Sequence, residues 1–290
     1  MAQRSAERRP DGGALALQMR LRAALVAHSG SGGARSWTGF QWQVALLVPP
    51  ALLYFFVRDL SAGQEAAAFE NASNIVSLQK TLGLDWEATL QQRVLDTDWI
   101  ISAVNWIYIY GHFPLLFTVL VLLFGLSKRD FVTLRNALVA SGVIGLVCFA
   151  LYPVAPPRLF APDQFFDSLG ELSTSYQILQ NPKVTNQFAA VPSFHVGWNL
   201  LAAIAVWRAT RFRPLKLIAA VVPALMMISV LLTANHWVLD IVAGVAVAMI
   251  GITGAKLFER YVAPRLHPEA IDASVDTDPT TVDLRSKQPA

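Results

Sequence analysis

The chain has 290 residues, of which 54% are hydrophobic and only 15% are charged, and its mean hydropathy is +0.44. Soluble domains carry roughly 25% charged residues, so this composition excludes an ordinary soluble domain, and its high hydrophobicity excludes a disordered chain. The single cysteine, Cys148, excludes an intramolecular disulfide. The composition therefore indicates a chain too apolar for water, and with the long apolar segments described below it predicts an all-α, polytopic membrane protein with six transmembrane helices.

Polar segments begin and end the chain. Residues 1–40 contain six arginines and are expected to form a disordered cytoplasmic tail, with a short amphipathic helix around Leu15–Val26. The apolar stretch Ala23–Ala27 is too short for a signal peptide, so no cleaved signal is expected. Residues 263–290 are polar and acidic and are expected to form a second disordered tail. Residues 41–262 are predicted to form one transmembrane domain, with its core at about 100–260.

Six segments are candidate membrane spans, because a bilayer core needs about 20 apolar residues in a helix. They are Phe40–Val57, Ile100–Leu126, Ala137–Tyr152, Phe194–Trp207, Leu215–Ala234 and Trp237–Phe258. The fourth reaches spanning length only if its helix begins near Val191, with Pro192 in the first turn, where proline is tolerated. Otherwise the count falls to five.

The basic residues predict an orientation. If the N-terminus lies inside, 18 of the 23 basic residues fall on the inner side and five on the outer side, as the positive-inside rule requires. Both termini are thus expected in the cytoplasm of a cell-membrane protein. The net charge of +3 then reflects orientation and not nucleic-acid binding, since no interleaved aromatic residues accompany the basic ones. Two long outer segments remain, an amphipathic helix within 58–99 and a loop over 153–192, and such loops often carry function.

Three histidines, His112, His195 and His236, fall in the predicted outer half of the membrane or at its edge, where polar residues are candidates for a functional site. The strongest pattern pairs His236 with Asp240, which at positions i and i+4 would share one face of a helix. A carboxylate there can bind one imidazole nitrogen and leave the other free as a base or nucleophile. The alternative is a structural His–Asp pair at the mouth of a helix.

A second pattern is Val191-Pro192-Ser193-Phe194-His195. The amides and dipole of a helix N-terminus form a phosphate site, and His195 beside that site could protonate a leaving oxygen. The alternative is a serine N-cap followed by an interfacial histidine.

Two further features supply candidate phosphate ligands. Arg158 follows Ala-Pro-Pro, and its guanidinium can bind phosphate oxygens bidentately; contact with lipid headgroups is the alternative. Asn105, Tyr108 and His112 are spaced by three and four residues and would form a polar stripe on the second span. That stripe either lines the cavity or makes interhelical hydrogen bonds.

The order of Arg158, Pro-Ser-Phe-His195 and His236-x3-Asp240 resembles the type 2 phosphatidic acid phosphatase (PAP2) superfamily. The resemblance covers about residues 100–260 and implies a six-helix membrane core with three motifs at its outer face. Ala-Pro-Pro-Arg followed by Pro-Ser-x-His is more specifically similar to the branch that contains inositol phosphorylceramide synthases.

The resemblance also implies roles for these residues. His236 would be the nucleophile that becomes phosphohistidine, Asp240 would orient it, and His195 would protonate the leaving group. Arg158 and the backbone around Ser193 would bind the phosphoryl oxygens. No metal or other cofactor is implied, because arginine and helix-end amides would stabilise the charge.

The sequence departs from the usual phosphatase motifs. Leu151 and Leu159 stand where the first motif has lysine and proline, and Val230 stands where the third motif has arginine after serine. Two expected cations are therefore missing, which fits the synthase-like branch and puts simple hydrolysis in doubt relative to transfer. The candidates to replace these cations are Asn235, Tyr108 and His112.

The function predicted from the sequence is a membrane phosphatase for a lipid phosphate held in the bilayer. The alternative is a phosphotransferase of the inositol phosphorylceramide synthase type, which moves a phosphoryl or phospho-headgroup to a lipid or sugar hydroxyl. Two other hypotheses are an intramembrane serine protease using Ser193 and His236, and a non-catalytic carrier or channel with a histidine-lined pore.

Overall fold

The computed structural model describes residues 48–173, 176 and 186–263. Within these residues the chain is helical and contains no β-strand, although one isolated parallel bridge joins Val154 to Ala189. The prediction of a helical membrane protein is confirmed at this level. The expected N-terminal tail, its short amphipathic helix and almost all of the expected C-terminal tail lie outside the described residues.

Three helices are each long and apolar enough to cross a bilayer: α8 (Lys128–Leu151), α13 (Arg213–Leu232) and α14 (Val238–Tyr261). A fourth span arises if the bent pair α6 (Asp98–Tyr110) and α7 (Phe113–Leu126) counts as one. The described part of α3 (Val48–Ala62) has 15 residues and α12 (Phe194–Ala209) has 16, fewer than the roughly 20 that a span needs. The structure thus supports three or four spans, and the count of six stays a prediction.

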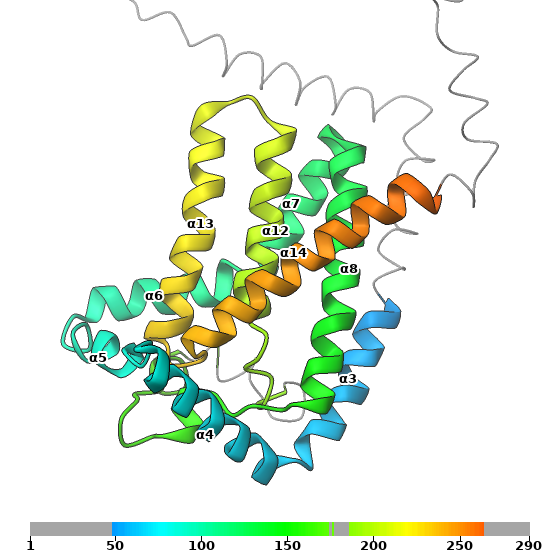
Figure 1. Ribbon diagram of the computed structural model, residues 1–290. Coiled ribbons are helices and arrows are strands. Elements are labelled where there is room, and N and C mark those ends of the chain that lie inside the picture. Colours follow the sequence, from blue (N-terminus) through cyan, green and yellow to red (C-terminus); the bar gives the residue numbers. More distant parts are fainter. Residues whose placement is uncertain (1–47, 174–175, 177–185, 264–290) are drawn as a thin grey trace, which may run out of the picture.

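The second predicted span is not one continuous helix. It breaks at Gly111 and His112, where α6 and α7 bend by 48°. Pro114 in the first turn of α7 has no N–H to bond the carbonyl of Tyr110, which favours a break in the helix at this point. As a result α6 crosses the bundle instead of running along it (Figure 1).

The fourth predicted span begins later than expected. Pro192 lies before the helix, Ser193 is an extended N-cap residue, and α12 starts at Phe194. The N–H of Ser193 donates to the main-chain oxygen of Asp240 at 3.0 Å, which holds this residue against α14 and outside the helix. The prediction that the helix starts near Val191 is therefore wrong.

Small residues let the long helices approach closely, as is common in membrane proteins. A Cβ on Gly251 of α14 would lie 2.8 Å from the carbonyl oxygen of Ala137 on α8. A Cβ on Gly197 of α12 would lie 2.7 Å from the carbonyl oxygen of Gly244 on α14. The first contact holds α14 against α8, and the second brings α12 and α14 together near their N-termini.

Two surface helices, α4 (Glu65–Leu82) and α5 (Glu87–Gln92), lie across that end of the bundle (Figure 1). The first is the amphipathic helix predicted within 58–99, and it buries one face at the spacing of Ala68, Ala72, Ile75 and Gln79. The loop between α8 and α12 lies at the same end and contains the short helices α9 (Pro157–Phe160) and α10 (Ser168–Leu172). The three sequence motifs therefore converge there.

Candidate active site

His236 and Asp240 meet at the start of α14, although not in the way the sequence suggests. His236 precedes the helix, Trp237 is the N-cap, and Asp240 is the third helical residue, so the two do not share a helix face. Oδ2 of Asp240 accepts a hydrogen bond from the N–H of Trp237 at 2.7 Å and lies 3.3 Å from Nδ1 of His236. The cap of the helix, and not its periodicity, brings the carboxylate to the imidazole.

Nδ1 of His236 has a second oxygen neighbour, the carbonyl of Ala190, at 2.9 Å. Both neighbours are acceptors, so Nδ1 carries the proton and donates, and Nε2 keeps its lone pair. His236 is buried and Asp240 is fully buried, so solvent does not compete for these contacts. The arrangement leaves one unprotonated nitrogen that can act as a nucleophile.

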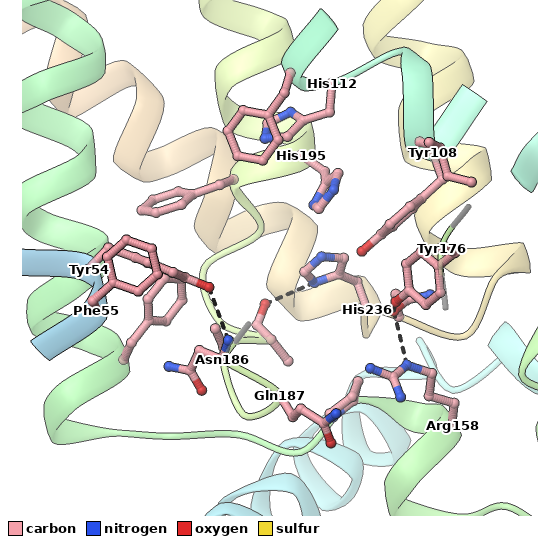
Figure 2. Close-up of a pocket in the computed structure, with 18 residues that line it drawn as sticks. Tyr54, Phe55, Tyr108, His112, Arg158, Tyr176, Asn186, Gln187, His195 and His236 are labelled. Atoms are coloured by element: carbon pink, nitrogen blue, oxygen red, sulfur yellow. Dashed lines mark hydrogen bonds between the residues drawn. The ribbon is translucent and has the colours of Figure 1, made fainter. Parts of the chain in front are cut away.

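Both His195 and His236 line a cavity of about 400 Å³, with their ring centroids 5.8 Å apart. Figure 2 shows Tyr108, Tyr176 and Arg158 on one side of these histidines, and Tyr54, Phe55 and Asn186 on the other. One side of the cavity therefore carries polar groups and the guanidinium, while the other side is mainly aromatic.

Two rings hold His195 in place. The ring of Tyr108 stacks on it at 4.3 Å between centroids, and that of His112 lies at 4.2 Å. The amide of Asn199 donates to the main-chain oxygen of His195 at 2.7 Å, and the same nitrogen lies 3.4 Å from Nδ1 of His112. The two ring contacts thus orient the imidazole of His195, and the amide of Asn199 links the backbone of His195 to the ring of His112.

The predicted polar stripe on the second span is split by the helix break. Tyr108 lies on α6, whereas His112 is the N-cap residue of α7, and both line the cavity. Asn105 instead exchanges two hydrogen bonds with Ser168 of α10, at 2.8 and 2.9 Å. Asn105 therefore ties α6 to the loop between α8 and α12, and it does not line the cavity.

Arg158 lies in α9 and is oriented by several polar contacts. Its Nε donates to Oδ1 of Asn235 at 3.0 Å, and its Nη1 lies 3.6 Å from the carboxylate of Asp167. The hydroxyl of Tyr176 donates to the same oxygen of Asn235 at 3.1 Å. The Asn235 amide nitrogen donates to the carbonyl of Thr233 at 2.9 Å, so this side chain orients Arg158 with its oxygen and keeps one of its two N–H groups for a ligand in the cavity that it lines.

Ser193 is fully buried, and its hydroxyl has no hydrogen-bond partner among the described residues. It is not part of the cavity lining, whereas its neighbours Phe194 and His195 are. No side chain caps the start of α12. The first amides of α12 lie at the same end of the helix as His195. The expected phosphate site at this helix start stays a prediction.

Sequence reasoning missed two tyrosines of the cavity. Tyr176 comes from the 153–192 loop, and burial raises its pKa to about 12, so its hydroxyl stays protonated and can donate. Tyr54 of α3 accepts a hydrogen bond from the main-chain N–H of Asn186 at 3.0 Å. Neither lies in a motif or a regular polar pattern, so only tertiary structure reveals them.

The site is thus that of a helical membrane protein with two histidines, a carboxylate and an arginine gathered at one end of the bundle. A family model described as the PAP2 superfamily matches residues 73–254, more than half of the chain. The chain belongs to the PAP2 superfamily, which comprises phosphatases and phosphotransferases. No curated protein and no solved structure matches it.

Proposed function

We propose that the protein is a membrane phosphatase for lipid phosphates and that His236 forms a phosphohistidine intermediate. The observation that carries this proposal is the pair of acceptors at Nδ1 of His236, namely Asp240 and the carbonyl of Ala190. They leave Nε2 unprotonated beside a cavity that His195 also lines. A nucleophile and a proton donor are thereby available to one bound phosphate.

In the first step Nε2 of His236 attacks phosphorus, and the bond from phosphorus to the lipid oxygen breaks. His195 gives its proton to that oxygen, so the lipid leaves as an alcohol. Arg158 binds the phosphoryl oxygens, where negative charge is concentrated. Asp240 stabilises the positive charge that develops on the imidazole of His236.

In the second step water attacks the phosphorus of phosphohistidine. His195, now neutral, takes the proton from that water, and the bond between phosphorus and Nε2 breaks. Free phosphate leaves, His195 is again protonated, and His236 returns to its starting state. One general acid–base therefore serves both steps.

The cavity supports a phosphate attached to an apolar chain. Among the described residues that line the cavity, Arg158 is the only lysine or arginine, and the aromatic lining residues include Tyr54, Phe55, Phe149 and Phe194. Pockets of this type use an apolar lining for bulk and a few polar groups for orientation. The aromatic part suits the first segment of a lipid chain, and the guanidinium suits its phosphate.

We further propose the orientation and domain organisation that the charges predict. Six spans in residues 41–262, with the 16-residue helix α12 as a short fourth span, would place both termini in the cytoplasm and the cavity at the outer membrane face. In support, the turn between α12 and α13, which carries Arg211 and Arg213, lies at the end of the bundle away from α4 and α5 (Figure 1).

A phosphotransferase of the inositol phosphorylceramide synthase type is the second candidate. Leu151 and Val230 stand where two phosphate-binding cations are usual, and neither lines the cavity. Leu151 is 79% exposed, and Val230 is fully buried in a hydrophobic cluster. These two departures from the usual phosphatase motifs are what favours the synthase-like branch, in which an acceptor hydroxyl would replace water in the second step.

A phosphate-release screen tests the proposal and separates the two candidates. Purified protein in lipid nanodiscs would receive phosphatidate, a prenyl diphosphate or an inositol-containing phospholipid, with and without polyol acceptors. Release of free phosphate without any acceptor is the expected result. Strict dependence on an acceptor would overturn hydrolysis in favour of transfer, and no turnover of any lipid phosphate would overturn both.

A further inference from the structure

Two buried polar side chains of the short helix α5 have no part in the mechanism above. Glu87 is 2% exposed and Gln91 is fully buried, and they lie four residues apart on one face of the helix. A buried carboxylate is costly unless hydrogen bonds compensate for the water it loses. The hydrogen-bond partners of Glu87 therefore indicate which part of the structure it stabilises.

Glu87 binds the start of the helix that follows His236. Its Oε1 accepts the N–H of Val238 at 2.9 Å, and Oε1 of Gln79 on α4 accepts the N–H of Leu239 at 3.0 Å. The amide of Gln79 also donates to Oε1 of Glu87 at 2.6 Å. The two side chains thus form one hydrogen-bonded unit at the N-terminus of α14.

If the hydrogen bond that Asp240 accepts is included, three consecutive N–H groups after His236 each donate to a side-chain oxygen. Trp237 donates to Asp240, Val238 to Glu87 and Leu239 to Gln79. The first amides of a helix lack partners within the helix, and usually one local residue caps them. Here two of the three acceptors are distant in the chain, because Glu87 lies 151 positions before Val238 and Gln79 lies 160 positions before Leu239.

Gln91 anchors the other side of α5. Its amide nitrogen donates to the carbonyls of Phe166 and Leu232 at 2.8 and 2.9 Å, and its oxygen accepts the N–H of Phe166 at 2.9 Å. These partners lie in the loop that carries Arg158 and at the end of α13. Through two side chains, α5 joins the segment with Arg158 to the segment with His236.

We propose that Glu87, supported by Gln79, is a positioning residue for the nucleophile. By binding the N–H of Val238 it fixes the first turn of α14, and with it the backbone of His236 and the carboxylate of Asp240. The same contacts occupy the amides of this helix start, so the phosphate is left to Arg158 and the start of α12. This inference rests on the proposed function, since it assigns His236 as the nucleophile.

Substitutions at Glu87 separate its acceptor oxygen from its charge. In Glu87→Gln an amide oxygen can still accept from Val238, whereas Glu87→Leu removes both acceptor and charge. We expect Glu87→Leu to lower kcat by about tenfold or more with KM changed by less than about twofold, and Glu87→Gln to restore kcat to within about threefold of wild type. Equal kcat in Glu87→Leu and wild type would overturn the proposal.

Glu259 provides a matched control at the opposite end of the same helix. Its carboxylate accepts from the hydroxyl of Thr133 at 2.8 Å and from the amide of Asn136 at 3.1 Å, which ties α14 to α8. Glu259→Leu should lower the Tm while leaving kcat unchanged. If it lowers kcat as much as Glu87→Leu does, the effect at Glu87 is a general loss of stability and positioning is overturned.

Hydrogen–deuterium exchange of the amides at 236–241 gives a second readout that needs no substrate. Glu87→Leu should speed exchange there, and Glu259→Leu should not. Should Glu87→Leu fail to fold, Gln79→Met removes the acceptor of Leu239 and the amide that donates to Glu87, and it should speed exchange in the same segment. Unchanged exchange in the folded variant overturns the positioning role, whereas absence of turnover by the wild type overturns only the proposed function.

Discussion

The main-chain oxygen of Ala190 lies 2.9 Å from Nδ1 of His236, closer to that nitrogen than the carboxylate of Asp240 at 3.3 Å. This oxygen belongs to a constrained stretch, because the N–H of Val154 donates to the carbonyl of Phe188 at 2.8 Å and Val154 bridges to Ala189. The proton on Nδ1 therefore has a fixed acceptor that no side-chain substitution removes.

The first prediction compares how much phosphate release depends on His236 and on Asp240. His236→Ala removes the nucleophile and should lower phosphate release by roughly a thousandfold or more. Asp240→Asn should have a smaller effect, about ten- to a hundredfold, because the carbonyl of Ala190 still holds the imidazole in the required tautomer. Initial rates of phosphate release measure both, and an Asp240→Asn loss equal to that of His236→Ala would show that Ala190 does not hold the tautomer.

The second prediction concerns the guanidinium of Arg158. Arg158→Lys keeps the charge but loses the planar fork and the bond to Asn235, so kcat/KM should fall by about tenfold or more. Tyr176→Phe removes one bond to Asn235 and leaves the Nε bond of Arg158, so its effect should be about threefold. Steady-state kinetics with one lipid phosphate compare the two. A larger loss in Tyr176→Phe would assign the tyrosine, and not the arginine, to the phosphate.

The third prediction concerns pH. Since burial raises the pKa of Tyr176 to about 12, its hydroxyl stays protonated through the range in which the assay is practical. The alkaline limb of the pH–rate profile should therefore be the same in wild type and Tyr176→Phe. A limb that moves with this substitution would mean that the hydroxyl titrates during the reaction.

The fourth prediction concerns the contact of α14 with the start of α12. A Cβ on Gly244 would lie 2.4 Å from the carbonyl oxygen of Ser193, whereas one on Gly254 of the same helix meets nothing within 4 Å. Gly244→Ala should destabilise the fold by about 1–3 kcal/mol and lower activity, because it displaces the backbone next to His195. Gly254→Ala should leave activity unchanged and stability equal or higher. Thermal unfolding with activity assays compares them, and equal behaviour of the two variants would refute the contact.

The fifth prediction uses Ser193, whose buried hydroxyl has no partner among the described residues. Ser193→Ala should not lower the Tm, because no hydrogen bond is lost, and phosphate release should persist. Retained activity in Ser193→Ala with loss of activity in His236→Ala would argue against the protease hypothesis, whereas loss of activity in both variants would favour it.

The motif residues could be placed from sequence because each motif is local. The pattern around His236 and Asp240, the start of α12 at His195 and the proline-stiffened segment before Arg158 each fix a side chain near a helix end. The order of these motifs along alternating helices then brings them to one end of the bundle, where the structure places Arg158, His195 and His236 in one cavity lining.

The remaining features depend on contacts that sequence periodicity does not encode. The apolar run through Gly111 and His112 predicted an unbroken helix, and only the geometry at Pro114 divides it. Glu87 and Gln79 belong to no sequence motif, and their partners at Val238 and Leu239 lie far along the chain. Burial of a polar side chain against a distant helix start leaves no local pattern to detect.

Trapping the phosphoenzyme tests the central claim most directly. Protein would be mixed with a radiolabelled lipid phosphate that supports turnover, quenched within milliseconds and digested, and the labelled peptide identified. We expect an acid-labile, base-stable label on the peptide that contains His236, present in wild type and absent in His236→Ala. A labelled peptide elsewhere, or phosphate release in wild type with no trapped label under conditions where the second step is slowed, would contradict a phosphohistidine at His236.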